Sequence, residues 1–398
     1  MNRRACVAAL VAVVVAAGAY AWGSNSGLPD AHATDSDQVS SAPIARVQVG
    51  SGPVALPATA GPRVSVVNGA LTLDGNPWWP TGFNAYELGT NWDVNKGCGA
   101  QVDLDDYFGS LPPHSVTRFD AFAALATNKH SGAQDFRALD AVFVTAARHD
   151  QLVIAVLSSG EGACGDGGFK DHDWFAGGWQ GIQAASSYAR WLDTAVARWH
   201  NSPALAGWEL VGEPETGICL DTTCQWQQRI CPADAAATLR SFFDTAGSRL
   251  RARDAYTPIW AGLAGGGQCG TAGDDYALVA GSPSIDVLDV HDYGPAGVLL
   301  PGDQYNGVER RLQQAKSVGK PLVIGELGQP AGSCGSLDER ASFLTQKVQA
   351  QRQAGSAGAI LWNYVPDPRS EECTMDIGPQ DPLFAALSKS PNGIRYTG

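Results

Sequence analysis

The stretch Leu205-Ala-Gly-Trp-Glu-Leu-Val-Gly-Glu-Pro214 combines an apolar run with a carboxylate directly after it. A continuous apolar run of this length is typical of a strand in a parallel sheet that is covered on both faces. Residues 205–211 are therefore expected to form a strand that ends close to Glu213. Seven further runs of this kind predict seven further strands, at 79–84, 115–120, 152–157, 258–262, 285–290, 321–325 and 359–364.

Helical patterns lie between the predicted strands, at 135–149, 184–200, 233–253, 308–318 and 337–354. Eight strand–helix units in one chain predict an α/β fold, a (β/α)8 TIM barrel. A doubly wound open sheet is the alternative. Residues 64–77, with a turn at Asn68-Gly69, predict a small N-terminal β-hairpin ahead of the barrel.

The N-terminal part of the chain is predicted to direct export. A basic start is followed by an apolar run at 5–18 and then by a small-x-small cleavage pattern, so residues 1–21 are expected to be a signal peptide or an N-terminal anchor. Residues 22–62 are rich in Ser, Pro and Ala and are expected to be a disordered linker. The barrel domain is expected to occupy residues 63–398.

The 398-residue chain is acidic, with 40 Asp and Glu against 27 Lys and Arg and a net charge of −13. Removal of residues 1–21, which carry Arg3, Arg4 and no acidic residue, changes this charge to −15. An acidic chain without a Lys/Arg cluster repels phosphate groups, so neither a nucleic acid nor an anionic membrane is an expected partner. Contact with a membrane is expected only through a possible N-terminal anchor.

The cysteines indicate an oxidising compartment. Nine are present, and Cys6 falls within the predicted signal segment, which leaves an even set at 98, 164, 219, 224, 231, 269, 334 and 373. Eight cysteines in an exported chain predict up to four disulfides, whose pairing the sequence leaves open. A zinc site at Cys219, Cys224 and Cys231 is the alternative. The absence of a C-x-x-C motif and of a nearby His weighs against it.

Candidate catalytic residues follow from the predicted barrel, because the chemistry of such barrels lies at the C-terminal ends of the strands. The polar and aromatic residues at these ends are Asn84, Arg118, Glu213, His291, Tyr293, Glu326 and Trp362. Two carboxylates among them can break a glycosidic bond, one as an acid and the other as a nucleophile or a base. A nearby Arg would keep a nucleophilic carboxylate ionised, and Arg118 is the candidate for that role.

Tryptophans in the predicted loops support a sugar-binding cleft, because an indole ring can stack on the apolar face of a pyranose. Four such residues are candidates for substrate contact, and about half of them are expected to touch it while the others pack in the core or anchor a loop: Trp92, Trp174, Trp179 and Trp226. Three others lie in strand or helix patterns and are expected to be core residues: Trp191, Trp199 and Trp208.

These motifs resemble a known family. The segment 208–214 (WELVGEP) resembles the acid/base motif of glycoside hydrolase family 5, the cellulase and β-mannanase family of clan A, and 323–328 (VIGELG) resembles its nucleophile motif. The segment 291–293 (HDY) is similar to the sixth-strand His-x-Tyr. Arg118 and Trp362 resemble the family's second-strand Arg and eighth-strand Trp. The resemblance extends through the whole barrel, over about residues 64–390.

The resemblance implies a retaining mechanism with Glu213 as acid/base and Glu326 as nucleophile, and neither a cofactor nor a metal. One position departs from the family pattern. Gly212 stands where the family normally has an Asn that hydrogen-bonds the 2-hydroxyl of the −1 sugar. A His common near the third strand end is also replaced, by 157–159 (LSS). Both departures concern the substrate rather than the bond-breaking chemistry.

The expected protein is a secreted, monomeric, retaining β-glycoside hydrolase that acts on a mannan- or glucan-like saccharide. A non-catalytic carbohydrate-binding protein on the same scaffold is one alternative, and a transglycosylase is another. The identity of the sugar, its linkage and endo or exo action depend on loop shapes that the sequence leaves open.

Overall fold

The computed structural model describes residues 63–165, 167–181, 187–221 and 224–388. The predicted signal segment 1–21 and linker 22–62 lie outside the described residues, as does the end of the predicted barrel domain at 389–398.

Eight parallel strands form the barrel, and each predicted apolar run contributes one of them. They are β4 (Thr81–Asn84), β5 (Val116–Asp120), β6 (Leu152–Val156), β7 (Leu205–Glu209), β10 (Ile259–Trp260), β11 (Leu288–Asp292), β12 (Leu322–Leu327) and β14 (Gly358–Leu361). The first and last strands, β4 and β14, pair with each other, and a bridge from Trp260 to Val287 joins β10 to the start of β11. The predicted (β/α)8 barrel is confirmed, and the open sheet is wrong because its two end strands would not meet.

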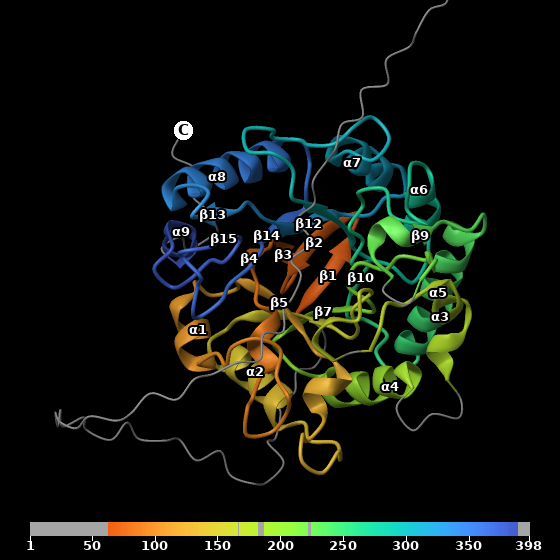
Figure 1. The fold of residues 1–398 in the computed structure, drawn as a ribbon, viewed down its shortest axis with the longest axis horizontal. Helices are drawn as coiled ribbons and strands as arrows, with labels where there is room; N and C mark the ends of the chain where they lie inside the picture. Colours follow the sequence, from red (N-terminus) through yellow and green to blue (C-terminus); the bar gives the residue numbers. More distant parts are fainter. Residues whose placement is uncertain (1–62, 166, 182–186, 222–223, 389–398) are drawn as a thin grey trace, which may run out of the picture. The chain divides into compact units, whose positions relative to one another are not determined.

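Helices surround the strands (Figure 1). The five predicted helices correspond to α2 (Arg137–Arg148), α4 (Tyr188–Trp199), α5 (Ala235–Arg251), α7 (Val308–Ser317) and α8 (Leu337–Gln353). Four shorter helices were not predicted from the sequence: α1 (Leu104–Ser110), α3 (His172–Ala176), α6 (Asp275–Ala280) and α9 (Pro382–Ser388). They are five to seven residues long and offer at most two turns of apolar periodicity.

Helix α4 illustrates how the sequence places a helix on the barrel. The Ser187 hydroxyl caps it by accepting a hydrogen bond from the Arg190 amide, which satisfies one of the free amides of the first turn. Its apolar side chains recur at helical spacing and are buried at Trp191, Leu192, Ala195, Val196 and Trp199. The predicted core role of Trp191, Trp199 and Trp208 is confirmed, since these side chains are at most 5% exposed.

The N-terminal hairpin closes one end of the barrel. Strands β1 (Val64–Val67) and β2 (Ala70–Leu73) are antiparallel, and the turn between them has positive φ at both Asn68 and Gly69, as a type I′ turn requires. A third strand, β3 (Asn76–Pro77), adds to the predicted pair. The hairpin lies across the middle of the ring of strands in Figure 1. Its apolar residues pack on the N-terminal half of the barrel interior, so the opposite end remains for a functional site.

Four disulfides hold the loops that follow the strands. The pairs are Cys98–Cys164, Cys219–Cys224, Cys231–Cys269 and Cys334–Cys373. The prediction of up to four disulfides is confirmed. The zinc alternative is wrong because all three of its cysteines form disulfides. Two small sheets lie in the same loops, β8 (Ile218–Cys219) with β9 (Arg229–Ile230) and β13 (Ala331–Gly332) with β15 (Cys373–Thr374). All four disulfides therefore stiffen the C-terminal rim of the barrel.

No helix within the described part of the chain combines the length and the hydropathy that crossing a membrane requires.

The disulfides should contribute unequally to stability. Cys98 and Cys164 are 66 residues apart, whereas Cys219 and Cys224 are 5 apart. Because a longer closed loop restricts the unfolded chain more, replacing the first pair by Ser should lower the free energy of unfolding by about 4 kcal/mol, against about 2 kcal/mol for the second. Urea unfolding of the two double variants measures both values. Equal losses, or a larger loss for Cys219–Cys224, would contradict this expectation.

Candidate active site

Three titratable side chains that are distant in sequence meet at the C-terminal end of the barrel. Glu326 lies in β12, His291 lies in β11, and Glu213 follows the end of β7. One carboxylate oxygen from each Glu and one ring nitrogen of His291 lie within 4.8 Å of one another. The Glu213 side chain is 39% exposed, whereas that of Glu326 is only 6% exposed. A ligand can therefore approach Glu213 directly and reach Glu326 at the bottom of the site.

The backbone at Glu213 adopts an unusual conformation. Its φ is 51°, in the left-handed region that non-glycine residues rarely occupy. Neighbouring strand ends hold it there, since the Glu213 amide donates to the Gly262 carbonyl at 2.9 Å and the Gly160 amide donates to the Gly212 carbonyl at 2.8 Å. A Cβ at Gly160 would lie 2.3 Å from the Glu213 carbonyl oxygen, so only glycine fits beside this turn.

Arg118, on β5, is the centre of the polar contacts beneath the carboxylates. It is 7% exposed, and its Nη1 donates to Glu326 Oε1 at 2.8 Å and to Asn84 Oδ1 at 2.9 Å. Its Nε and Nη2 donate to the two oxygens of Glu209 at 2.7 and 2.6 Å. Such a two-point contact fixes the guanidinium plane. Arg118 therefore holds Glu326 in place, and its expected role of keeping this carboxylate ionised stays a prediction.

Glu209 is a site residue that the sequence analysis missed. It is fully buried at the end of β7 and neutralises much of the charge of Arg118. The sequence did contain a sign of this role, since Glu209 lies within an otherwise apolar run. A carboxylate in such a strand is rarely buried without a cationic partner.

Asn84, the last residue of β4, supports this arrangement from the side. It is 1% exposed, and its amide donates to the Gly325 carbonyl at 2.9 Å while its oxygen accepts from Arg118. The place of Asn84 at a strand end makes it a candidate for contact with substrate, but this side chain is not open to a ligand. Its side chain is covered and positions the guanidinium instead.

A second buried carboxylate supports the acid/base loop. Asp289 lies two residues before His291 on β11, and its Oδ2 accepts from the Gly262 amide at 2.8 Å. The Gly262 carbonyl in turn accepts from the Glu213 amide. Burial, together with the charge of Glu209, raises the pKa of Asp289 to about 7. The sequence analysis missed Asp289 because an Asp in a strand carries no sign of which face it occupies.

The side chains at the end of β11 alternate between two environments. His291 and Tyr293 face the carboxylates, whereas Asp292 faces α8 and accepts a hydrogen bond from the buried Lys347 Nζ at 2.8 Å. The Tyr293 hydroxyl donates to Glu326 Oε2. The ion pair between Asp292 and Lys347 therefore anchors the strand end that carries two site residues.

His291 shares a proton with the carboxylates. Its Nδ1 lies 2.6 Å from Glu213 Oε1 and 3.3 Å from Glu326 Oε2. Burial lowers the pKa of His291, but the charge of Glu326 and the hydrogen bond to Glu213 outweigh it and raise the pKa to about 8. Below that pH the imidazole carries the proton between the two carboxylates.

The pKa values of the two carboxylates are shifted in opposite directions. Burial raises the pKa of Glu213, but the hydrogen bond and charge of His291 outweigh it, and the pKa is lowered. For Glu326, burial is the dominant influence and raises the pKa despite the opposing charges of His291 and Arg118. The resting site therefore stores its proton on His291, one hydrogen bond away from Glu213.

Aromatic rings form one wall of the site. Trp362, directly after β14, stacks on Tyr86 with ring centroids 5.9 Å apart and planes at 15°. The ring of Tyr293 meets the same indole edge-on at 6.5 Å. Trp362 is thus held against the carboxylate cluster. Tyr86 is a further wall residue, which the sequence analysis missed because it begins a 3-10 helix of only four residues, Tyr86–Gly89, too short to leave a periodic pattern.

The four loop tryptophans divide into two pairs. Trp92 and Trp226 are 47% and 53% exposed and remain available to a ligand. Trp179 is 3% exposed and packs against Tyr188 and Phe242, and Trp174 packs on the same two rings. The expected substrate contact of Trp179 is therefore wrong, whereas Trp174 is only partly buried and its contact with substrate stays a prediction. The short helix α3 folds this loop over α5, where apolar rings gain more from packing than from exposure.

Glu213, His291 and Glu326 are better suited to share a proton than to bind a metal ion. Two carboxylates and an imidazole could in principle bind a divalent cation. An imidazole ligand must be deprotonated, however, and the raised pKa of His291 keeps this one protonated near neutral pH. Cys98, Asp120 and Cys164 also lie close together, but the two thiols form a disulfide.

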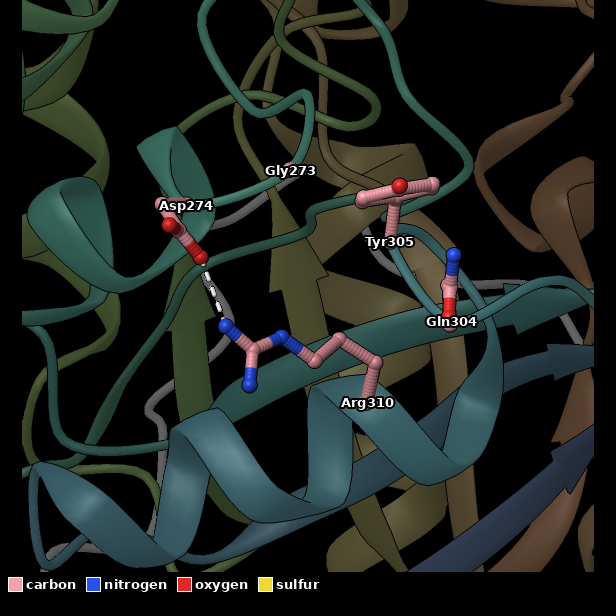
Figure 2. Close-up of a pocket in the computed structure, with 5 residues that line it drawn as sticks. All are labelled: Gly273, Asp274, Gln304, Tyr305 and Arg310. Carbon is pink, nitrogen blue, oxygen red and sulfur yellow. Dashed lines mark hydrogen bonds and ion pairs between the residues drawn. The ribbon is translucent and has the colours of Figure 1, made fainter.

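A separate surface hollow of about 300 Å³ lies between α6 and the loop that precedes α7. Figure 2 shows Arg310 of α7 reaching Asp274, with Tyr305 and Gln304 beside it. The ion pair joins Arg310 Nη2 to Asp274 Oδ1 at 2.6 Å, and the Asp274 side chain is 88% exposed. The residues that line this hollow include neither catalytic candidate, so it is not the candidate active site.

Comparison with known sequences identifies relatives of low identity. No family model matches the chain. The chain is 25% identical over 249 residues to a probable mannan endo-1,4-beta-mannosidase F of Aspergillus flavus, a match that covers 59% of this chain and 49% of the relative. It therefore spans about half the length of that relative. A probable mannan endo-1,4-beta-mannosidase A-1 of Aspergillus terreus is 23% identical over 325 residues, which cover 74% of this chain and 77% of the relative.

Solved structures share the fold. The endo-1,4-beta-mannanase from Rhizomucor miehei superposes with a TM-score of 0.61 at 15% identity and covers 83% of this chain and 98% of its own. A glycoside hydrolase family 5 mannosidase from the same organism gives 0.55 at 13% identity, over 82% and 96% of the two chains. The resemblance to glycoside hydrolase family 5 is thus supported. These likenesses show the barrel fold, and this chain combines that fold with two carboxylates at strand ends.

The contributions of Arg118 and Glu209 to the free energy of unfolding should depend strongly on each other. Glu209→Ala leaves a buried guanidinium with half of its partners, so the free energy of unfolding should fall by about 3–5 kcal/mol. Arg310→Ala breaks an exposed ion pair and should change stability by less than about 1 kcal/mol. Urea unfolding measures both, and a double-mutant cycle with Arg118→Met should give a loss well below the sum of the single losses. Additive losses would show that the two side chains do not depend on each other.

Proposed function

We propose that the chain is a secreted, retaining β-glycoside hydrolase that cleaves a mannan- or glucan-like saccharide through a covalent glycosyl-enzyme intermediate. One observation carries the proposal: oxygens of Glu213 and Glu326 lie within 4.8 Å of each other, bridged by His291. Retaining enzymes place their carboxyl groups about 5–5.5 Å apart, whereas inverting enzymes need a wider gap to admit a water molecule. The names of the Aspergillus relatives make mannan the first substrate to test.

In the first step, Glu326 attacks the anomeric carbon while the leaving oxygen takes a proton from Glu213. Arg118 and Tyr293 hold the two oxygens of Glu326 in place for the attack. Glu213 receives its proton from His291 Nδ1 across the 2.6 Å contact as negative charge develops on the leaving oxygen. The products of this step are the released alcohol and a glycosyl ester on Glu326.

In the second step, Glu213 acts as a base. It removes a proton from a water molecule that attacks the anomeric carbon and displaces Glu326. The proton returns to the Glu213–His291 pair, and the sugar keeps its original anomeric configuration because it has undergone two inversions. No cofactor takes part in either step as proposed.

Export is supported by two independent features. The predicted signal segment at 1–21 would route the chain out of the cytosol. The four disulfides on the barrel rim are typical of proteins in an oxidising compartment.

Replacement of the nucleophile should separate catalysis from folding. Glu326→Ala should lower kcat at least about 10⁴-fold on β-mannan and β-glucan substrates while the far-UV circular dichroism spectrum stays unchanged. Incubation of the wild type with a 2-deoxy-2-fluoro glycoside should add the mass of one glycosyl group to the peptide that contains Glu326. Turnover at the wild-type rate in Glu326→Ala would contradict the assignment of Glu326 as the nucleophile. Glycan binding without cleavage by the wild type would favour the non-catalytic alternative.

Activity should fall in alkaline solution. The pKa of His291 is raised from its ordinary 6.5 to about 8, so the shared proton is present below that pH and is lost above it. We expect kcat/KM to decline above about pH 8. In His291→Asn the imidazole that stores the proton is absent, so the alkaline limb should move to lower pH, where Glu213 alone loses its proton. A pH–rate profile of both proteins measures the two limbs, and an unchanged limb in the variant would contradict the role of His291.

A further inference from the structure

Arg229 joins two loops of the barrel rim beside the candidate acid/base residue. Its Nη1 donates to Glu161 Oε1 at 2.8 Å and to Glu215 Oε2 at 2.7 Å, and its Nη2 donates to Glu161 Oε2 at 2.6 Å. Glu161 lies in the loop after β6, whereas Glu215 follows Glu213 by two residues. One guanidinium therefore ties the loop after β6 to the segment that carries Glu213.

The guanidinium of Arg229 is packed between other groups. Its side chain is only 5% exposed, its Cζ lies 3.9 Å from the ring centroid of Phe169, and its Nε donates to the Cys224 carbonyl at 3.0 Å. A two-point contact with a carboxylate fixes the plane of a guanidinium, and a charge that has lost most of its water depends on its ionic partners. These contacts therefore hold the Arg229 side chain more firmly than a solvated ion pair would.

The backbone that carries Arg229 is cross-linked on both sides. Arg229 begins β9 and pairs with Cys219 of β8, and a disulfide from Cys219 to Cys224 closes this hairpin. Two residues after Arg229, Cys231 is bonded to Cys269 in the loop after β10. These covalent links restrict the positions that Arg229 can take, so its side chain is a fixed support for the neighbouring loops.

Support at Glu215 reaches Glu213 because Pro214 alone lies between them, and proline fixes its own φ. The Glu213 amide donates to the Gly262 carbonyl at 2.9 Å, which holds the backbone on one side. The left-handed conformation at Glu213 persists only where its surroundings hold it. The contact of Glu215 with Arg229 supplies a second anchor, on the C-terminal side of Glu213.

Arg229 also acts on Glu213 through its charge. The ionisable groups that influence Glu213 are His291, Glu326, Arg118 and Arg229. Burial raises the pKa of Glu213, whereas the hydrogen bond and charge of His291, and then the charges of the two arginines, lower it. Without Arg229, its two carboxylate partners would remain as negative charges near a third carboxylate, and like charges raise a carboxyl pKa.

We propose that Arg229 is a positioning residue for the general acid: through Glu215 it holds Glu213 at the place from which its carboxyl group protonates the leaving oxygen. The inference rests on the proposed glycosidase function and adds a residue that lies outside the strand-end cluster. General acid catalysis contributes about 10²- to 10⁴-fold to a rate, and a displacement of about 1 Å can cost about 10²-fold. Loss of the anchor at Glu215 therefore removes a measurable part of the effect of Glu213.

The test compares phenyl and 2,4-dinitrophenyl β-glycosides of manno- and gluco-oligosaccharides. Phenoxide is a poor leaving group that needs a proton from Glu213, whereas 2,4-dinitrophenoxide departs without one. Arg229→Gln should lower kcat/KM by about 10- to 100-fold on the phenyl glycosides and by less than about threefold on the dinitrophenyl glycosides. A loss of folded protein alone would lower both values by the same factor.

A charge-conserving variant separates position from charge. Arg229→Lys keeps the positive charge but cannot form the two-point contact, so it should show the same preference for the better leaving group while its pH–rate profile stays like that of the wild type. Arg229→Gln loses the charge as well, so the carboxylates near Glu213 hold the shared proton more tightly. The alkaline limb of kcat/KM should therefore move to higher pH in Arg229→Gln only.

Arg198→Gln is the matched control. Arg198 also pairs with a carboxylate, since its Nε donates to Asp140 at 2.6 Å, and its Cζ lies 4.4 Å from the ring centroid of Phe136. These contacts join α4 to α2 and involve no rim loop. The control should lose stability but keep the wild-type ratio of kcat/KM between the two leaving groups. Thermal unfolding reports the folded fraction of each variant.

Three outcomes would overturn the inference. Equal losses on both leaving groups in folded Arg229→Gln, or a leaving-group effect of the same size in Arg198→Gln, remove the positioning role and leave the glycosidase function standing. If Arg229→Gln does not fold, Glu215→Gln tests the same contact from its other side, and an unchanged ratio in that variant removes the role as well. If the wild type cleaves none of these glycosides, the proposed function and this inference fail together.

Discussion

The buried positive charge of Arg118 is the constraint on which the rest of the site depends. A guanidinium inside the barrel requires anionic partners, and Glu209 and Glu326 supply them from two different strands. The same guanidinium fixes one oxygen of Glu326 and the side-chain oxygen of Asn84. The position of the candidate nucleophile and the order of the strand ends around it therefore depend on one side chain.

The candidate acid/base residue is held by different means. Glu213 lies after its strand, in a left-handed conformation that the Gly262 carbonyl and the close approach of Gly160 stabilise. Its side chain is partly exposed and contacts His291, whose raised pKa makes the imidazole the resting position of the proton. Burial thus raises the pKa of Glu326, and a charged neighbour lowers that of Glu213, although both carboxylates share one imidazole.

The strand pattern was predictable because all eight strands are buried on both faces and therefore read as apolar runs. The short helices and the wall residue Tyr86 were not, since two turns of helix or a four-residue 3-10 helix leave no periodic signal. Trp174 and Trp179 illustrate a related limit: a tryptophan in a loop suits a sugar and a core equally well. Only the packing of this loop on α5 decides that Trp179 is buried and that Trp174 is partly buried.

The sequence by itself determined the order of strands and helices, the even set of eight cysteines and the strand-end positions of Glu213, Glu326, Arg118, His291 and Tyr293. These follow from local hydrophobicity and from the rule that barrel chemistry lies at one end of the strands. The tertiary structure decided which side chains touch. The pairing of Glu209 with Arg118, the covered position of Asn84 and the support of Gly262 by Asp289 each join residues from different strands or strand ends. The distances between these residues are set by the closure of the barrel, which cannot be derived from any single stretch of sequence.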